Sequence, residues 1–230
     1  MADAENSGLT VHHLNDSRSQ RILWLLEELE VPYQIKKYER DADRLAPKEL
    51  SAVHPLGTAP VITDGDITLA ESGAIVEYLL RKYGQGDLRA TDTLSDLYFT
   101  HYAEGSLMPL LVFKLIFQMA PQKAPFIIRP FIGLLFGTLA RRLVDPRLKL
   151  HADMIEKHLS KDDRLWFAGG LGPTTSDYMM TFPLEAWLHD DPAANGVLGP
   201  KTRAYVQRVH ERALTFAQAI EKGGPYAFAE

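Results

Sequence analysis

The sequence contains no cysteine in its 230 residues. This absence excludes disulfide bonds, CxxC redox pairs, cysteine zinc sites and any cysteine nucleophile. The chain also has no excess of basic residues, because 25 Lys and Arg stand against 30 Asp and Glu and give a net charge of −5. The basic residues are scattered, so the sequence does not predict a nucleic-acid-binding surface. The eight histidines lack the spacing of metal ligands, and we expect no metal.

Long hydrophobic runs are missing as well. The most apolar stretch, residues 126–140, contains Arg129 and Pro130 and is shorter than the ~20 residues that a membrane-spanning helix needs. We therefore expect no transmembrane span. Residues 1–8 are polar and acidic, unlike a signal or transit peptide, and we interpret them as a flexible leader. With 46% hydrophobic and 24% charged residues, the chain has the composition of a globular protein.

Residues 9–84 predict a small α/β domain. Strands are expected at 9–14 and 33–38 around a helix over 17–30, and a short helix follows at 45–53. Residues 60–70 contain two β-prone runs around Asp64-Gly65, the kind of pair that favours a type I′ hairpin. A last helix covers 74–83, and Ser72 is its natural N-cap. The order is βαβαββα, in which the first strand–helix–strand unit implies a parallel pair.

Residues 85–92 contain two glycines and are predicted to link this domain to an all-helical domain over 93–230. Helices are expected at about 93–119, 126–142, 146–160, 176–188 and 200–221. Thr174 and Asp177 form a capping box, which is a folding element without chemistry. Residues 108–140 are unusually apolar, and three interpretations stay open for them: buried helices, a wide hydrophobic site, or contact with a membrane surface.

Four motifs follow one another along the chain: SRSQRILWLLEELEVPY from residue 17, HPLGTAPVI at 54–62, ESGAIVEYL at 71–79 and PTTSDYMMTFPLE at 173–185. In this order and spacing they resemble the cytosolic glutathione transferase family. The residues of these motifs, together with AEGSLMPLL at 103–111, are most similar to the fungal Gtt-type members. The resemblance covers residues 9 to about 220. It implies a thioredoxin-like domain followed by an all-helical domain, a symmetric homodimer in the cytoplasm, and glutathione as co-substrate.

The resemblance assigns glutathione to two of these motifs. In the family the bond before Pro60 is cis, which turns the backbone of Ala59 outward to pair with the cysteinyl part of glutathione. Ser72, at a helix N-terminus, would bind the γ-glutamyl carboxylate, and Glu71 would bind the ammonium group. From the residues alone, a plain serine N-cap beside an exposed glutamate is an equally good interpretation.

A transferase must stabilise the thiolate, because a free thiol with a pKa of about 8.5 is mostly protonated at neutral pH. The family places Tyr, Ser or Cys near the start of the first helix, and this sequence has no Tyr between residues 9 and 32. We predict Ser17 as the donor, helped by the helix dipole, with Asn15 as runner-up. Arg18 would serve a glutathione carboxylate or the partner subunit. The alternative for Ser17 is a simple helix N-cap, and the alternative for Arg18 is a solvated surface arginine.

The glycyl carboxylate of glutathione needs a cation, which the family supplies from the region that here contains Arg40, Arg44 and Lys48. The sequence does not choose between these three residues. His54 is a candidate donor to the peptide, and a buried, satisfied histidine is an equal alternative.

The second substrate is expected between the domains. The resemblance places an apolar electrophile against residues that include Tyr98, Tyr102, Met108, Val112 and Phe113. We expect a glutathione transferase with a side activity on organic peroxides. A specialised glutathione-dependent step of secondary metabolism and a non-catalytic glutathione-binding protein are the alternatives.

Overall fold

The computed structural model describes residues 8–41, 45–84, 91–190, 194–212 and 214–229, so most of the predicted leader and linker lies outside the described residues. The N-terminal part contains a four-stranded sheet in the order β2-β1-β3-β4. Its strands are β1 (Leu9–Leu14), β2 (Gln34–Tyr38), β3 (Val61–Asp64) and β4 (Ile67–Ala70). β1 is parallel to β2 and antiparallel to β3, and β3 and β4 form a hairpin.

Three helical segments complete this domain. α1 (Ser19–Glu28) connects the parallel strands, a short 3₁₀ helix (Lys48–Ala52) precedes β3, and α2 (Ser72–Tyr83) follows β4. The predicted βαβαββα order and the thioredoxin-like class are therefore confirmed.

The β3–β4 turn differs from the predicted type I′ turn at Asp64-Gly65. Asp64 still belongs to β3 and pairs with Ile67, so the two loop residues are Gly65 and Asp66. Of these two, Gly65 alone has a positive φ, of 59°, which is the arrangement of a type II′ turn. The Asp64 carboxylate instead accepts hydrogen bonds at 2.7–2.8 Å from three side chains of α2: Tyr78, Lys82 and Tyr83.

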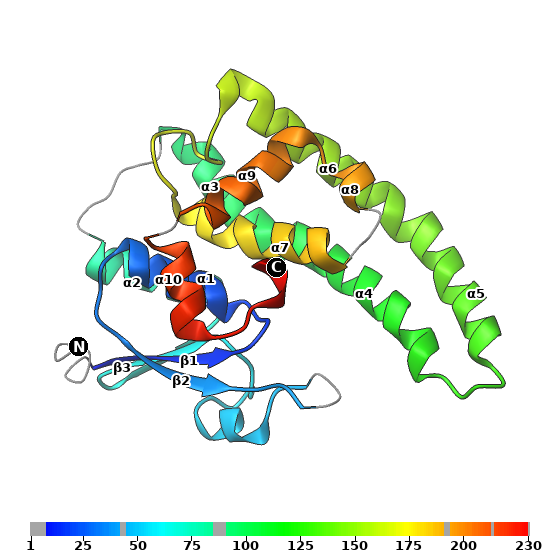
Figure 1. Ribbon diagram of the computed structural model, residues 1–230, viewed down its shortest axis with the longest axis horizontal. Coiled ribbons are helices and arrows are strands. Elements are labelled where there is room, and N and C mark those ends of the chain that lie inside the picture. The colour runs from blue at the N-terminus through cyan, green and yellow to red at the C-terminus, as the bar shows by residue number, and fades with distance from the viewer. Residues whose placement is uncertain (1–7, 42–44, 85–90, 191–193, 213, 230) are drawn as a thin grey trace.

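The C-terminal part contains helices joined by turns and loops, with no strand among its described residues (Figure 1). α3 (Thr93–Tyr102), a π turn (Ala103–Leu107) and α4 (Met108–Lys123) form one continuous rod. α5 (Arg129–Leu139), a second π turn (Ala140–Val144) and α6 (Asp145–Ser160) form another. The chain continues through a 3₁₀ turn (Lys161–Asp163), α7 (Thr175–Asp190), α8 (Ala194–Val197), α9 (Pro200–His210), α10 (Phe216–Gly223) and a last 3₁₀ turn (Ala227–Ala229).

Two predicted helix boundaries are wrong. The predicted break between 142 and 146 is absent, because the π turn accommodates Pro146, whose ring and missing N–H would disturb a regular helix at that position. The predicted helix over 200–221 is two helices, because the chain turns after α9 and packs α10 against α1. Half of the capping box is confirmed, since the Thr174 N–H donates to Asp177 Oδ2 at 2.9 Å. The Thr174 hydroxyl instead donates to Asp96 of α3, which also accepts the N–H of Ser176 at 2.9 Å.

One apolar core extends through both domains and encloses α1. Trp24 of α1 is fully buried and contacts Tyr178 of α7 and Phe216 of α10, with ring centroids 4.8 and 5.8 Å away. α1 therefore lies between the sheet and the helical domain (Figure 1). Packing on both sides fixes the position of its N-terminal end, which faces the site described below.

The hairpin of α4 and α5, which we call the arm (residues 108–139), extends away from the rest of the molecule (Figure 1). α5 has no buried residue, so the interpretation of this segment as a buried helix is wrong. The rod over Thr93–Lys123 is long and apolar enough to cross a membrane by length and composition alone, which the sequence analysis overlooked. The most apolar part of this rod is 22% buried, and its earlier residues Phe99 and Ala103 belong to the core.

Candidate functional site

A cleft of about 1240 Å³ lies between the sheet domain and the beginning of the helical domain. The first domain contributes the residue before α1, the end of the loop before β3, and the junction of β4 with α2. The helical domain contributes α3 and the π turn after it. The lining residues that matter below are Arg18, Ala59, Pro60, Glu71, Ser72 and Glu104.

The Ala59–Pro60 peptide bond is cis, as predicted. Pro60 is buried and Ala59 is half-buried, and both line the cleft. They immediately precede β3, whose first residue Val61 pairs with both neighbouring strands. The sheet therefore holds this part of the cleft in place.

The junction of β4 with α2 presents a helix N-terminus to the cleft. Glu71, with a φ of 70°, occupies the N-cap position, and its carbonyl accepts the N–H of Ile75 at 2.9 Å. Ser72 is the first helical residue, so the prediction of Ser72 as the N-cap is wrong by one position. The first turn of a helix has N–H groups without intrahelical partners and a partial positive charge, which together favour an anion.

The predicted thiol donor, Ser17, is buried behind the cleft and is not among its lining residues. Its hydroxyl donates to the Leu14 carbonyl at 2.7 Å and lies 2.7 Å from the hydroxyl of Ser19. The runner-up, Asn15, accepts the N–H of Arg40 at 2.9 Å through its side-chain oxygen. Both side chains therefore brace the turn from β1 into α1, and from this turn Arg18 reaches the cleft.

Arg18 is held in the cleft by Glu104 of the helical domain. Its Nε lies 3.0 Å from both carboxylate oxygens of Glu104, and the same carboxylate accepts a bond of 2.9 Å from Nη1 of Arg21. Arg21 is completely buried, and this burial lowers the pKa of its guanidinium, while the charge of Glu104 opposes the shift. Both guanidinium groups also lie over the ring of Phe182, at 5.7 and 5.3 Å from its centroid.

Sequence analysis missed Glu104. A signal for it exists, because Glu104 is the sole acidic residue between Asp96 and Asp145. An isolated carboxylate in a long apolar segment usually needs a partner. The sequence pattern does not show which residue is the partner, because the partners Arg18 and Arg21 are more than 80 positions away in the chain.

A second, smaller cavity of about 280 Å³ adjoins the first. Three of the five predicted electrophile-binding residues line it, namely Met108, Val112 and Phe113, and so do Arg18 and Glu104. The other two predicted residues lie elsewhere. Tyr102 is buried with its hydroxyl hydrogen-bonded to His151, and Tyr98 stacks on the Tyr102 ring at a centroid distance of 5.6 Å.

Two of the cations predicted for the glycyl carboxylate, Arg40 and Lys48, do not line the cleft. Arg40 donates to the carbonyls of residues 15 and 16 at 3.2 and 3.3 Å, and Lys48 is exposed on the 3₁₀ helix. Arg44 lies outside the described residues. His54 is half-buried, and its Nδ1 accepts the N–H of Leu56 at 3.4 Å. Within the part of the chain that the structure describes, the Arg and Lys residues that line the cleft are Arg18, Arg81 and Lys82.

Among the described residues, no group of three or more His, Asp or Glu side chains is placed to hold a metal ion.

The comparisons with known proteins agree with one another. The family model "Glutathione S-transferase, N-terminal domain" matches residues 7–81. Glutathione S-transferase 3 of Schizosaccharomyces pombe is 31% identical over 229 residues, which cover 93% of each chain. The chain belongs to the glutathione S-transferase family. Glutathione S-transferase 1 of Saccharomyces cerevisiae is 32% identical over 190 residues, or 77% of this transferase and 80% of the relative.

A solved structure of a glutathione S-transferase from Actinobacillus pleuropneumoniae superposes with a TM-score of 0.71 and 27% identity, over 96% of this chain and 95% of that one. The protein is thus a glutathione transferase that uses glutathione as co-substrate, and the resemblance to fungal members is confirmed by its two yeast relatives. The matched N-terminal region contains Arg18, Ala59–Pro60 and Glu71–Ser72.

Proposed function

We propose that the larger cleft holds glutathione, that the smaller cavity holds an apolar electrophile, and that the transferase joins the two beside Arg18 and Glu104. One observation carries this proposal: both cavities are lined by these same two side chains. A thiolate in one cavity and an electrophile in the other would be neighbours, and such proximity is a large part of the rate gain in a two-substrate reaction.

The charges of the cleft suit the γ-glutamyl end of glutathione. The first turn of α2, with Ser72, would bind its carboxylate, and Glu71 would bind its ammonium group. The backbone of Ala59 would pair with the cysteinyl part in the manner of an added strand. Arg40, Arg44, Lys48 and His54 stay candidates for the glycyl end, together with Arg18, and single alanine variants would rank them by the KM for glutathione.

Thiol activation is assigned to the turn from β1 into α1. Ser17 stays the first candidate donor, and donation to the thiolate would require its hydroxyl to leave the Leu14 carbonyl. The guanidinium of Arg18 and the N-terminal end of α1 would favour the thiolate through charge. A fall of two units in the thiol pKa corresponds to about 2.7 kcal/mol, which a hydroxyl and a nearby positive charge can supply.

The test is a pH titration of glutathione bound to the wild type and to Ser17→Ala, followed by the ultraviolet absorbance of the thiolate. If Ser17 is the donor, the variant raises the thiol pKa by about one to two units and lowers kcat in proportion. Asn15→Ala tests the runner-up donor in the same way. An unchanged thiol pKa in Ser17→Ala would refute the donor role, and an unchanged pKa together with no measurable conjugation by the wild type would favour a binding protein.

The apolar lining of the smaller cavity favours a hydrophobic electrophile. We expect conjugation of generic apolar electrophiles and a weaker reduction of organic peroxides. Steady-state rates on both substrate classes would test this. Near-zero turnover on all of them, with tight glutathione binding, would favour a specialised pathway enzyme.

A symmetric homodimer in the cytoplasm completes the proposal. It is supported by α3, where Leu94, Leu97 and Tyr98 are 75%, 57% and 52% exposed on one side of the helix. Analytical ultracentrifugation should show a dimer for the wild type and a smaller species for Leu97→Glu. A monomeric wild type would contradict the proposal.

A further inference from the structure

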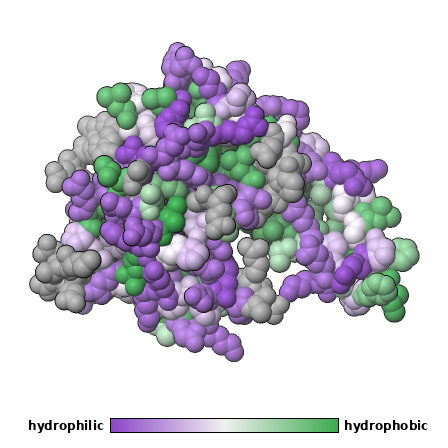
Figure 2. Space-filling model, in the orientation of Figure 1, coloured by the Kyte–Doolittle hydropathy of each residue, from purple (hydrophilic) through white to green (hydrophobic). Residues whose placement is uncertain are grey.

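The arm exposes apolar side chains at its tip and along both of its helices. Phe126 and Ile127, in the loop between α4 and α5, are each 83% exposed. Phe131 and Leu134 on α5 are 74% and 68% exposed, and Ile116 on α4 is 48% exposed. Figure 2 shows apolar residues gathered at the end of this projection, away from the polar surface of the body.

α5 is apolar on all of its sides. Phe136, on the inner side, packs on Phe117 of α4 with ring centroids 5.3 Å apart. The outer side carries Phe131, Leu134 and Leu135, whose spacing places them on one face of the helix. A helix that is apolar all round is normally buried in protein or in lipid, and large exposed apolar patches mark interaction surfaces.

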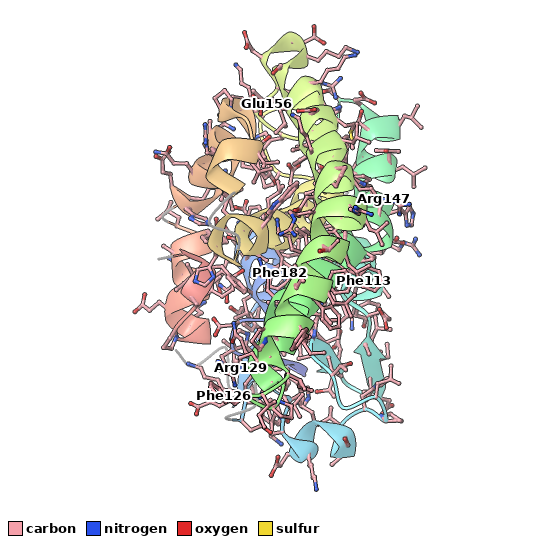
Figure 3. The ribbon with its side chains drawn as sticks, turned by 90° about the vertical axis from the view of Figure 1, so that its right-hand side faces the viewer. Phe113, Phe126, Arg129, Arg147, Glu156 and Phe182 are labelled. Carbon is pink, nitrogen blue, oxygen red and sulfur yellow. The ribbon has the colours of Figure 1, made fainter. Side chains whose placement is uncertain are left out.

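The charge of this region is of one sign. Residues 105–144 contain no Asp or Glu, and their basic residues are Lys114, Lys123, Arg129, Arg141 and Arg142. Lys114 is paired with the following Asp145 at 3.1 Å, whereas Arg141 and Arg142 are exposed. The rest of the chain is acidic, since the net charge of the whole is −5. Arg129 donates to the carbonyls of Gln122 and Ala124 at 3.2 and 3.4 Å, so it closes the loop at the tip, where Figure 3 shows it beside Phe126.

We propose that the arm docks the transferase on the surface of a membrane that contains anionic lipids. Phe126 and Ile127 enter the apolar edge of the bilayer, α5 lies in the interface, and the exposed side chains of Arg141 and Arg142 meet the lipid headgroups. α5 is 11 residues long, or about 17 Å, which is too short to cross the hydrocarbon core of roughly 30 Å. The rod that contains α4 is held in the core by Phe99 and Ala103, so it does not cross the bilayer either, and the contact is peripheral.

A bilayer fits the arm better than a second copy of the chain does. The exposed apolar residues are distributed over α4, the loop and α5, so the end of the arm can enter a bilayer, whereas a protein partner would cover one face of the arm. Two arms packed on each other would also bring their basic residues together without any carboxylate from residues 105–144 between them.

The test is flotation of the full-length protein with vesicles of phosphatidylcholine alone and with vesicles that contain about one third phosphatidylserine. We expect binding to the anionic vesicles that weakens as salt is raised. The double variant Phe126→Asp/Ile127→Asp should bind at least ~10-fold more weakly. The matched control Leu171→Asp/Leu214→Asp, at positions 97% and 79% exposed outside the arm, should bind like the wild type.

A variant with fewer positive charges measures the electrostatic contribution to vesicle binding separately from the apolar one. Arg141→Gln/Arg142→Gln should lose about 25-fold in binding to anionic vesicles, at roughly fivefold per basic residue. Conjugation activity and melting temperature are measured on every variant. Should Phe126→Asp/Ile127→Asp melt at a lower temperature, Phe131→Ser/Leu134→Ser takes its place in the binding assay.

Four results would overturn the proposal. The wild type fails to float with anionic vesicles, or it binds equally to vesicles without phosphatidylserine. A correctly folded tip variant binds like the wild type. Without lipid, the tip variant forms a smaller assembly than the wild type in ultracentrifugation, which would show that the arm covers a second copy.

Discussion

Replacement of Glu104 by alanine should strongly destabilise the protein. Arg21 is completely buried on α1, and Glu104 is the carboxylate to which it donates, at 2.9 Å. The Nε and Nη2 atoms of Arg21 have no hydrogen-bond partner among the described residues. Glu104→Ala therefore leaves a buried guanidinium without a compensating charge, a change that typically costs about 3–5 kcal/mol of the free energy of unfolding.

The size of this effect can be separated from the loss of packing by a double-mutant cycle. Arg21→Met replaces the buried charge by an apolar chain of similar length, and such replacements of a whole buried ion pair are often neutral. Glu104→Ala should then cost at least ~2 kcal/mol less in the Arg21→Met background than in the wild type. Glu77→Ala, which breaks an exposed ion pair with Arg81, should cost about 0.5 kcal/mol or less.

Thermal and urea unfolding at neutral pH measure these differences. For a chain of this length, ~3–5 kcal/mol corresponds to a fall in Tm of about 10 °C. A loss below ~1 kcal/mol in Glu104→Ala, or the same loss with and without Arg21, would show that the guanidinium does not depend on this carboxylate.

Three further changes have definite expected outcomes. Glu28→Ala should lower the free energy of unfolding by about 3–5 kcal/mol in urea titrations, because the buried carboxylate holds Arg212 at 2.5 Å and Thr215 at 2.6 Å and so fastens α10 to α1; a loss below ~1 kcal/mol would contradict this. Burial lowers the pKa of His13 to about 4. The unfolded chain therefore takes up the proton first, and stability should fall by about 3 kcal/mol as the pH drops from 6.5 to 4. Melts of His13→Asn across this range should show a smaller loss, and an equal loss would exclude His13 as its source. Phe113→Ala should reduce kcat/KM for an apolar electrophile by about tenfold with an unchanged KM for glutathione, since this half-exposed ring lines the smaller cavity; a raised KM for glutathione would refute the assignment of the two cavities.

The first domain could be predicted almost completely because its signals are local. Alternating β-prone residues, a Gly at the hairpin turn and helical spacing in α1 each act over a few residues. The failures concern contacts between distant segments. The break after α9 follows from the docking of Arg212 on Glu28, 184 positions earlier in the chain, and no periodicity near the break reports that contact.

The candidate site was predicted in its backbone features and less well in its side chains. The cis bond at Pro60 follows from the resemblance to the family, and the helix start near Ser72 follows from a short motif. The orientation of Ser17 does not, because a buried hydroxyl chooses between several acceptors, and here it donates to the Leu14 carbonyl. The exposed outer face of α5 was equally hidden, since an apolar helix has the same sequence pattern whether protein, lipid or solvent surrounds it.

The cluster of Arg18, Glu104 and Arg21 lies where the two domains meet, and two of its members, Arg18 and Glu104, line both cavities. Arg18 is 35% exposed, so its ion pair with Glu104 contributes little to stability. Arg21 is fully buried in the core and fixes the Glu104 carboxylate from behind. The Glu104 carboxylate, which lines both cavities, is therefore held in a fixed position by a residue of the core. A small displacement of the helical domain on α1 would move this carboxylate, and with it the separation of the two proposed substrates.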